Sequence, residues 1–127
     1  MKKFLLILIA CLFMPALCPA ATAVFMSGFE DLPLMDGLKQ AEDEAVSFDA
    51  PSGRIIEAYA RSDKIGKRKI EEFYNKTLPQ LGWKIVSVKK KTSALAYERE
   101  GETLTISIDD EGAPLSVRFE LMTREKD

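Results

Sequence analysis

The alternation of apolar and polar residues in the last third of the chain constrains its fold most strongly. Apolar side chains occupy every second position of two runs: Leu104, Ile106, Ile108 and then Leu115, Val117, Phe119, Leu121. A period of two directs the apolar side chains of a strand to one face. Polar residues fall on the other face, which predicts an antiparallel sheet with one side in solvent.

Four more strands fit the rest of the pattern. Residues 46–49 alternate, and Ala50-Pro51-Ser52-Gly53 supplies turn residues before a second run at 54–61, which together predict a β-hairpin. Residues 83–88 and 93–100 predict two strands joined by a lysine-rich turn at 89–92.

One helix is expected, over residues 65–80. Ser62 and Asp63 are N-cap residue types, while Pro79 and Gly82 are placed to end the helix. The apolar residues at helical spacing form one stripe: Ile65, Ile70, Phe73, Tyr74, Leu78 and Leu81. The indole of Trp83 is expected to pack over the helix end, where its N–H needs a partner if buried.

The predicted order of elements is ββ-α-ββββ, a two-layer α+β domain over residues 45–124 with one helix packed on a curved antiparallel sheet. Residues 24–44 show no regular period and form an irregular N-terminal segment. This segment is too apolar for a solvated linker, so we expect it to cover part of the domain. A docking segment for a partner protein is the alternative, with Phe25, Phe29, Leu32 and Leu34 as its contacts.

The first 23 residues predict a secretory signal peptide. Lys2 and Lys3 precede an uncharged apolar run, and Ala21-Thr22-Ala23 forms an A-x-A cleavage site. Periplasmic or secreted localisation follows. Two alternatives stay open: a lipoprotein modified at Cys11, and an uncleaved anchor over residues 4–26, which is long enough to span a bilayer.

Histidine is absent from the chain, and both cysteines lie within the predicted signal peptide. Residues 24–127 therefore lack the commonest acid/base groups, nucleophiles and metal ligands, so no catalytic residue, cofactor or metal is expected. Carboxylate pairs could serve a weak hydrolase. Glu98, Glu100, Glu102 and Glu120 qualify only by residue type, and the acids at 109–111 are expected to form a solvated turn.

Basic residues gather in the middle of the chain. Residues 51–91 hold eleven bases and four acids, between two acidic flanks. Two clusters stand out: Lys64, Lys67, Arg68 and Lys69 at the helix start, and Lys89, Lys90 and Lys91 in a turn. An ordinary solvated face is the first interpretation of these clusters. Cations at a helix N-terminus oppose the macrodipole, and this placement gives a reason to consider the alternative, attraction to anionic lipid or envelope polymer. Export argues against nucleic acid as the partner.

Two stretches resemble a group of uncharacterised small exported proteins of Gram-negative bacteria. These proteins carry a PSGRI-type turn, here Pro51-Ser52-Gly53-Arg54-Ile55, and an FYxxTLPxLGW stretch, here residues 73–83. The resemblance covers roughly residues 45–121. It implies a shared fold and an envelope setting, and it carries over no activity and no site residue.

The sequence thus favours an exported, non-enzymatic binding or assembly module of the bacterial envelope. Such a module would meet a protein partner through the sheet face, an edge strand or the segment from Phe25 to Leu38. The alternative is a peripheral binder of anionic lipid or envelope polymer through the basic clusters. A carboxylate-dependent hydrolase is the third reading.

Overall fold

The computed structural model describes residues 24–86 and 94–124. It shows an α+β protein that is mostly antiparallel sheet with one α-helix, so the predicted fold class is confirmed at this level. The predicted signal peptide, with Cys11, and the lysine-rich turn at 89–91 lie outside the described residues.

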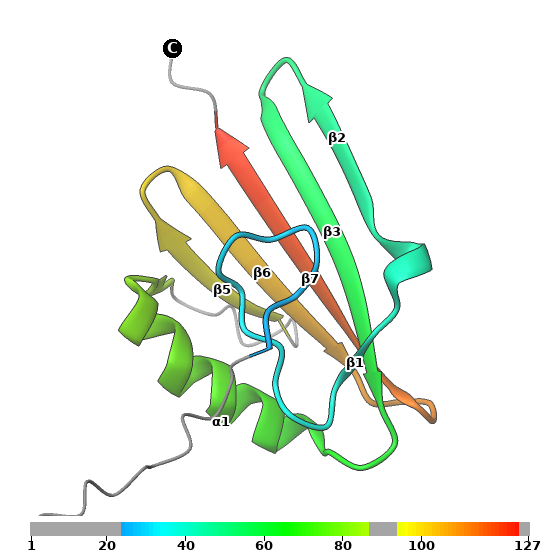
Figure 1. The fold of residues 1–127 in the computed structure, drawn as a ribbon. Helices are drawn as coiled ribbons and strands as arrows, with labels where there is room; N and C mark the ends of the chain where they lie inside the picture. Colours follow the sequence, from blue (N-terminus) through cyan, green and yellow to red (C-terminus); the bar gives the residue numbers. More distant parts are fainter. Residues whose placement is uncertain (1–23, 87–93, 125–127) are drawn as a thin grey trace, which may run out of the picture.

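Within these two described ranges the sheet contains seven strands, and every pairing between them is antiparallel. The strand order is β1-β3-β7-β6-β5-β4, with β2 also paired to β3 (Figure 1). The strands are β1 (Lys39–Gln40), β2 (Val46–Ala50), β3 (Gly53–Ser62), β4 (Lys84–Ile85), β5 (Ala94–Arg99), β6 (Glu102–Asp109) and β7 (Leu115–Arg124).

The register of the three long strands places the apolar residues in rows across one face. Ala58 of β3, Phe119 of β7 and Ile106 of β6 pair side by side, and all three are fully buried. We call this side the covered face and the other side the open face. The open face carries polar residues such as Arg118 and Thr105, so the predicted alternation on these strands is confirmed.

The helix is shorter than predicted. Helix α1 spans Lys67–Thr77 and continues as the 3-10 helix η2 (Leu78–Leu81), because Pro79 cannot donate to the α-helical ladder. Gly82 ends it in the left-handed conformation with φ 91°, as its position suggested. In the part of the chain that the structure describes, no helix combines the length and apolar character needed to cross a membrane.

Residues 24–38, which we call the strap, run across the covered face (Figure 1). Tyr74 of α1 contacts both the sheet and the strap: its ring lies 5.4 Å from that of Phe119, and its hydroxyl donates to the carbonyl oxygen of Pro33 at 2.9 Å. Met26, Leu32 and Leu38 of the strap are buried in the core. The strap therefore covers its own domain, as the sequence suggested.

The segment after the strap is more regular than predicted. Residues 39–40, placed in the irregular segment by the sequence, form β1 on β3, and Glu42–Glu44 form the 3-10 helix η1. A strand of only two residues is too short to show an alternating pattern in the sequence. The observed order is thus β1, η1, β2, β3, α1, η2 and β4 to β7.

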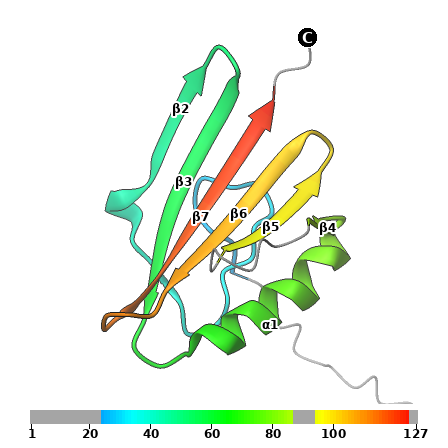
Figure 2. The same cartoon turned by 180° about the vertical axis from the view of Figure 1, so that it is seen from behind.

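The β2–β3 hairpin has the predicted turn, and Gly53 is required there. Its φ is 138°, and a Cβ atom would lie 1.8 Å from the carbonyl oxygen of Thr123 in β7. The absence of a side chain lets the start of β3 approach the end of β7 closely. Seen from behind, β2 lies at the edge of the sheet away from α1, and no described strand or helix runs along its outer side (Figure 2).

Candidate functional site

The structure separates the residues that the sequence singled out. Lys64, Arg68 and Lys69 are exposed at the start of α1, and Lys67 is half-buried. Arg68 pairs with Glu72 at 3.4 Å, which offsets part of the positive charge. The second basic cluster, Lys89, Lys90 and Lys91, lies outside the described residues.

The strap residues differ in their exposure. Phe25 is 50% exposed, whereas Leu32 is only 3% exposed and belongs to the core. Phe29 and Leu34 are half-buried against the same core. Only Phe25 of these four therefore presents a largely open apolar surface to a partner.

A cavity of about 300 Å³ lies between the strap and one end of the covered face. Its apolar lining comes from the strap, the strands and the segment between η2 and β4: Phe29, Leu32, Ile56, Trp83, Leu104 and Leu121. Gly28 brings the strap backbone near the sheet, since a Cβ there would lie 4.0 Å from Ile56. The strap thus roofs a hollow at this end instead of filling it.

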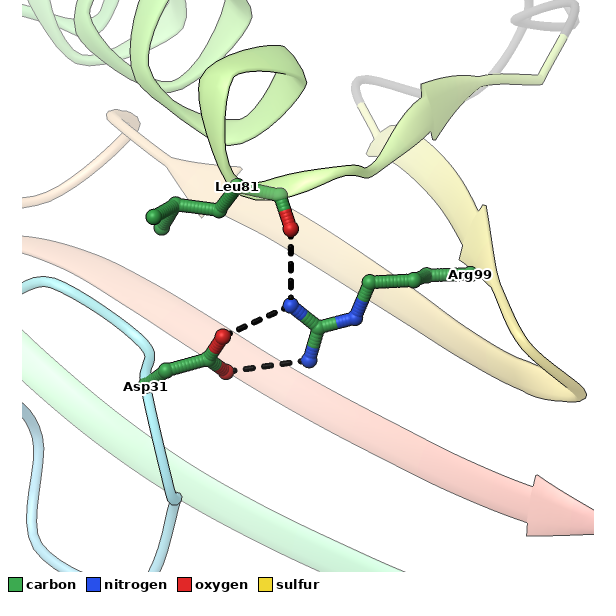
Figure 3. A network of polar contacts seen from close by, with 3 residues as sticks. All are labelled: Asp31, Leu81 and Arg99. Carbon is green, nitrogen blue, oxygen red and sulfur yellow. Dashed lines mark hydrogen bonds and ion pairs between the residues drawn. The ribbon is translucent and has the colours of Figure 1, made fainter.

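An ion pair bounds the cavity on one side. Arg99 of β5 donates two hydrogen bonds to the Asp31 carboxylate, at 2.6 and 3.0 Å, and a third to the carbonyl oxygen of Leu81 at 3.0 Å (Figure 3). Hydrogen bonding to Arg99 holds the pKa of the Asp31 carboxyl below its usual value, and Asp31 likewise raises the pKa of Arg99. Both residues also line a second, more open hollow of about 790 Å³.

Trp83 links this ion pair to the cavity wall. The guanidinium carbon of Arg99 lies 4.2 Å from the ring centroid of Trp83, a cation–π contact. The indole is 5% exposed, and its Nε1–H has no hydrogen-bond partner in the described residues. The sequence predicted that Trp83 packs at the helix end, and the structure adds a buried donor that lacks the expected partner.

Three of the four candidate carboxylates, Glu98, Glu100 and Glu102, line the open hollow of about 790 Å³, and Glu120 does not. Glu120 lies on the open face, where Arg118 donates to it at 2.6 Å and also binds Glu57. The hydrogen bond that Arg118 donates to Glu57 lowers the pKa of the Glu57 carboxyl. Glu102 instead lines the cavity on the covered face, while Glu98 and Glu100 are exposed. Glu120 is therefore apart from the other three acids, which share one hollow.

The acidic turn at 109–111 is exposed, and the Asp109 carboxylate accepts a hydrogen bond from the backbone N–H of Glu111 at 3.1 Å. Within residues 24–86 and 94–124, no cluster of three or more acidic, histidine or cysteine side chains is arranged to hold a metal ion.

An exposed apolar patch lies on the open face. Phe48 of β2, Ile55 of β3 and Met122 of β7 form a cross-strand row, and Val46 lies on the same face. Val46 and Phe48 are each 49% exposed and Met122 is 37% exposed. The alternation of residues 46–49 was visible in the sequence, but the face on which it lies depends on the pairing with β3.

The geometry thus offers two sites: the cavity beneath the strap and the apolar row beside β2. Comparisons of the chain with known protein families, with curated proteins and with solved structures found no match.

Proposed function

We propose that this chain is an exported, non-enzymatic protein-binding module of the bacterial envelope, which binds an extended segment of a partner along β2. The apolar row beside an unpaired strand edge is the observation that carries this proposal. The signal-like N-terminus and the lack of histidine and cysteine after residue 23 support export and argue against common catalytic chemistry.

The edge of β2 offers backbone groups to a partner strand. Among the described residues, β2 pairs only with β3, so its outer side has no strand beside it. An edge strand presents free N–H and C=O groups, which an extended peptide can bind by extending the sheet. Natural edges are often blocked by charged side chains, especially lysine, or by proline. Residues 46–50 contain no lysine or proline, and their one charged residue, Asp49, lies on the covered face opposite Arg54.

The apolar row supplies side-chain contacts next to that edge. Phe48, Ile55 and Met122 lie in line across three strands, with Phe48 on the edge strand itself. Aromatic residues and methionine are enriched at protein interfaces, and contiguous exposed apolar surface marks interaction sites. A partner strand with an apolar residue at alternate positions would bury this row.

The proposal assumes that the domain has two layers. Its elements after β1 would then follow the order ββ-α-ββββ. In this arrangement α1 and the strap form the layer on the covered face. The open face and the edge of β2 then remain for the partner.

Site-specific photo-crosslinking in producing cells tests the proposal. A photoreactive phenylalanine replaces Phe48 in one variant and Phe25 in the other, because the two residues have matched exposures of 49% and 50%. We expect one discrete adduct from position 48 and none from position 25. Adducts from position 25 alone would move the interface to the strap, and adducts from neither would overturn the proposal.

A charge substitution checks that the adduct depends on the edge. Val46→Lys in the position-48 variant should abolish the adduct, because it places a charge within the apolar patch. Val24→Lys is the matched control, since Val24 is also exposed, at 62%, but lies on the strap. An adduct that persists with Val46→Lys would contradict binding at β2.

The exposed cations at the start of α1 favour a second candidate, a peripheral binder of anionic lipid or envelope polymer. Lys64, Arg68 and Lys69 would make the contacts. Sedimentation with anionic liposomes or lipopolysaccharide at low and high salt tests it. Binding that salt abolishes would support this candidate, and failure to bind at either salt concentration would remove it.

A further inference from the structure

The cavity beneath the strap has a layered floor that follows the strand register. Ile56, Leu121 and Leu104 pair across β3, β7 and β6 and form an apolar row. The next row along these strands, on the side away from the fully buried row of Ala58, Phe119 and Ile106, is Arg54, Thr123 and Glu102. It lies on the same covered face. All six residues line the cavity. An apolar floor therefore ends in a rim with a cation on one side and a carboxylate on the other.

The walls and the size suit a small ligand. Phe29 and Leu32 of the strap and the indole of Trp83 surround the floor, which gives the cavity two aromatic walls. Its volume of about 300 Å³ lies at the lower end of the range for small-molecule sites.

Five charged residues line the cavity: the ion pair of Arg99 and Asp31, the exposed carboxylate of Glu30, and Arg54 and Glu102 at the rim. Arg99 and Asp31 neutralise each other at 2.6 Å and leave neither free for a ligand. Arg54 is held only by weak, exposed contacts: its guanidinium donates to Ser47 Oγ at 3.4 Å and lies 3.8 Å from Asp49, with side chains 60% and 88% exposed in the ion pair, and such pairs contribute little. Glu102 is half-buried and has no hydrogen-bond or ion-pair partner in the described residues.

We propose that this cavity binds a small zwitterion with an apolar body, of the class of apolar α-amino acids and their dipeptides. The apolar body lies on Ile56, Leu121 and Leu104 between the aromatic walls. Its carboxylate pairs with Arg54 and its ammonium group pairs with Glu102. This inference does not rest on the proposed partner site, because Phe48 and Met122 lie on the opposite face of the sheet.

Trp83 provides the readout, since it is the chain's one tryptophan and lines the cavity. We would titrate residues 24–127 with three probes and follow Trp83 emission and the heat of binding. L-phenylalanine carries both charges, N-acetyl-L-phenylalanine only the carboxylate, and phenethylamine only the ammonium group. We expect L-phenylalanine to bind at least about ten-fold more tightly than either analogue.

Two charge-removing variants assign each end of the ligand. Arg54→Gln should weaken L-phenylalanine about ten-fold and leave phenethylamine unchanged, whereas Glu102→Gln should weaken L-phenylalanine and leave N-acetyl-L-phenylalanine unchanged. Equal affinity for all three probes would overturn the proposal. An absence of any response to L-phenylalanine up to about 10 mM would overturn it as well.

A filled cavity supplies an independent check. Leu121→Phe should occupy the hollow and abolish binding, while Met122→Phe, at the next residue of β7 but on the open face, should leave binding intact. Circular dichroism establishes that each variant is folded. Binding retained by folded Leu121→Phe would place the ligand elsewhere, and the two charge variants decide the question if this variant does not fold.

Discussion

The two ends of the covered face differ in packing although they share strands and register. At one end, the row of Ala58, Phe119 and Ile106 is fully buried, and Tyr74 packs on Phe119. At the other end, the row of Ile56, Leu121 and Leu104 lies under a cavity of about 300 Å³. Helix side chains cover the first row, while the strap crosses the second at Gly28, which has no side chain to insert. The element that lies over each row therefore determines whether side chains fill the space above it.

The largest expected effect is a truncation at the packed end. Phe119→Ala should lower the free energy of unfolding by about 3–5 kcal/mol, because the ring is fully buried and its neighbours cannot collapse into the space. Leu121→Ala, two residues along the same strand, should cost only about 1–2 kcal/mol, because this side chain already borders a hollow. Urea unfolding of both variants measures the two losses in the free energy of unfolding. Equal losses would contradict the difference in packing between the two rows.

One position near the hollow end is tightly packed through its backbone. Gly53→Ala should cost about 1–3 kcal/mol, because the added Cβ meets the Thr123 carbonyl oxygen and the φ of 138° disfavours a side chain. Gly112→Ala serves as the control, since nothing lies within 4 Å of its Cβ position. Thermal unfolding should separate the two variants, and similar melting temperatures would show that the approach of β3 to β7 relaxes easily.

The strap is anchored differently at the two ends. At the packed end, Tyr74→Phe removes the hydroxyl that donates to Pro33 and leaves a buried carbonyl oxygen without this partner. We expect a loss of about 1–2 kcal/mol in urea unfolding. Tyr59→Phe, on the open face, should be near neutral by the same measurement. A Tyr74→Phe protein as stable as the wild type would show that side-chain burial alone holds the strap.

The anchor nearer the hollow is an ion pair, and its loss should have the smallest effect. Asp31→Asn should cost less than about 1 kcal/mol at neutral pH, because the Asp31 side chain is 43% exposed. Arg99 lowers the Asp31 pKa in the folded state, so the stabilisation is complete above the unfolded value of 3.8 and is lost as the pH falls through the folded-state value.

Unfolding measured across this acid range checks the sign. The stability difference between wild type and Asp31→Asn should shrink as the pH approaches about 2. Asp36→Asn is the control within the strap, since Asp36 is exposed. A difference that grows toward acid would contradict the lowered pKa.

Local patterns in the sequence were sufficient for much of the fold. Alternation in residues 103–121 identified β6 and β7, and Pro79 with Gly82 marked the end of the helical region, because these features act within a few residues of their position. The helix began two residues later than predicted, and β1 was missed. The helix start is an error at an element boundary, where side-chain pattern is weakest, whereas β1 is a whole element too short to show a pattern.

The candidate site could not be predicted because it depends on distant pairings. Asp31 and Arg99 are 68 residues apart in the chain, and nothing near either residue indicates the other. The rim formed by Arg54 and Glu102 exists only because both pair with Thr123 of β7. Val46 and Phe48 show the same dependence, since a shift of one residue in register would have turned them inward.

Ile55 and Ile56 are neighbours on β3, yet one belongs to the row on the open face and the other to the floor of the cavity. A single backbone segment thus serves two surfaces that share no side chain. Because successive side chains of a strand point to opposite faces, a substitution at Ile55 alters the open face and one at Ile56 alters the cavity, so mutagenesis can address the two surfaces one at a time.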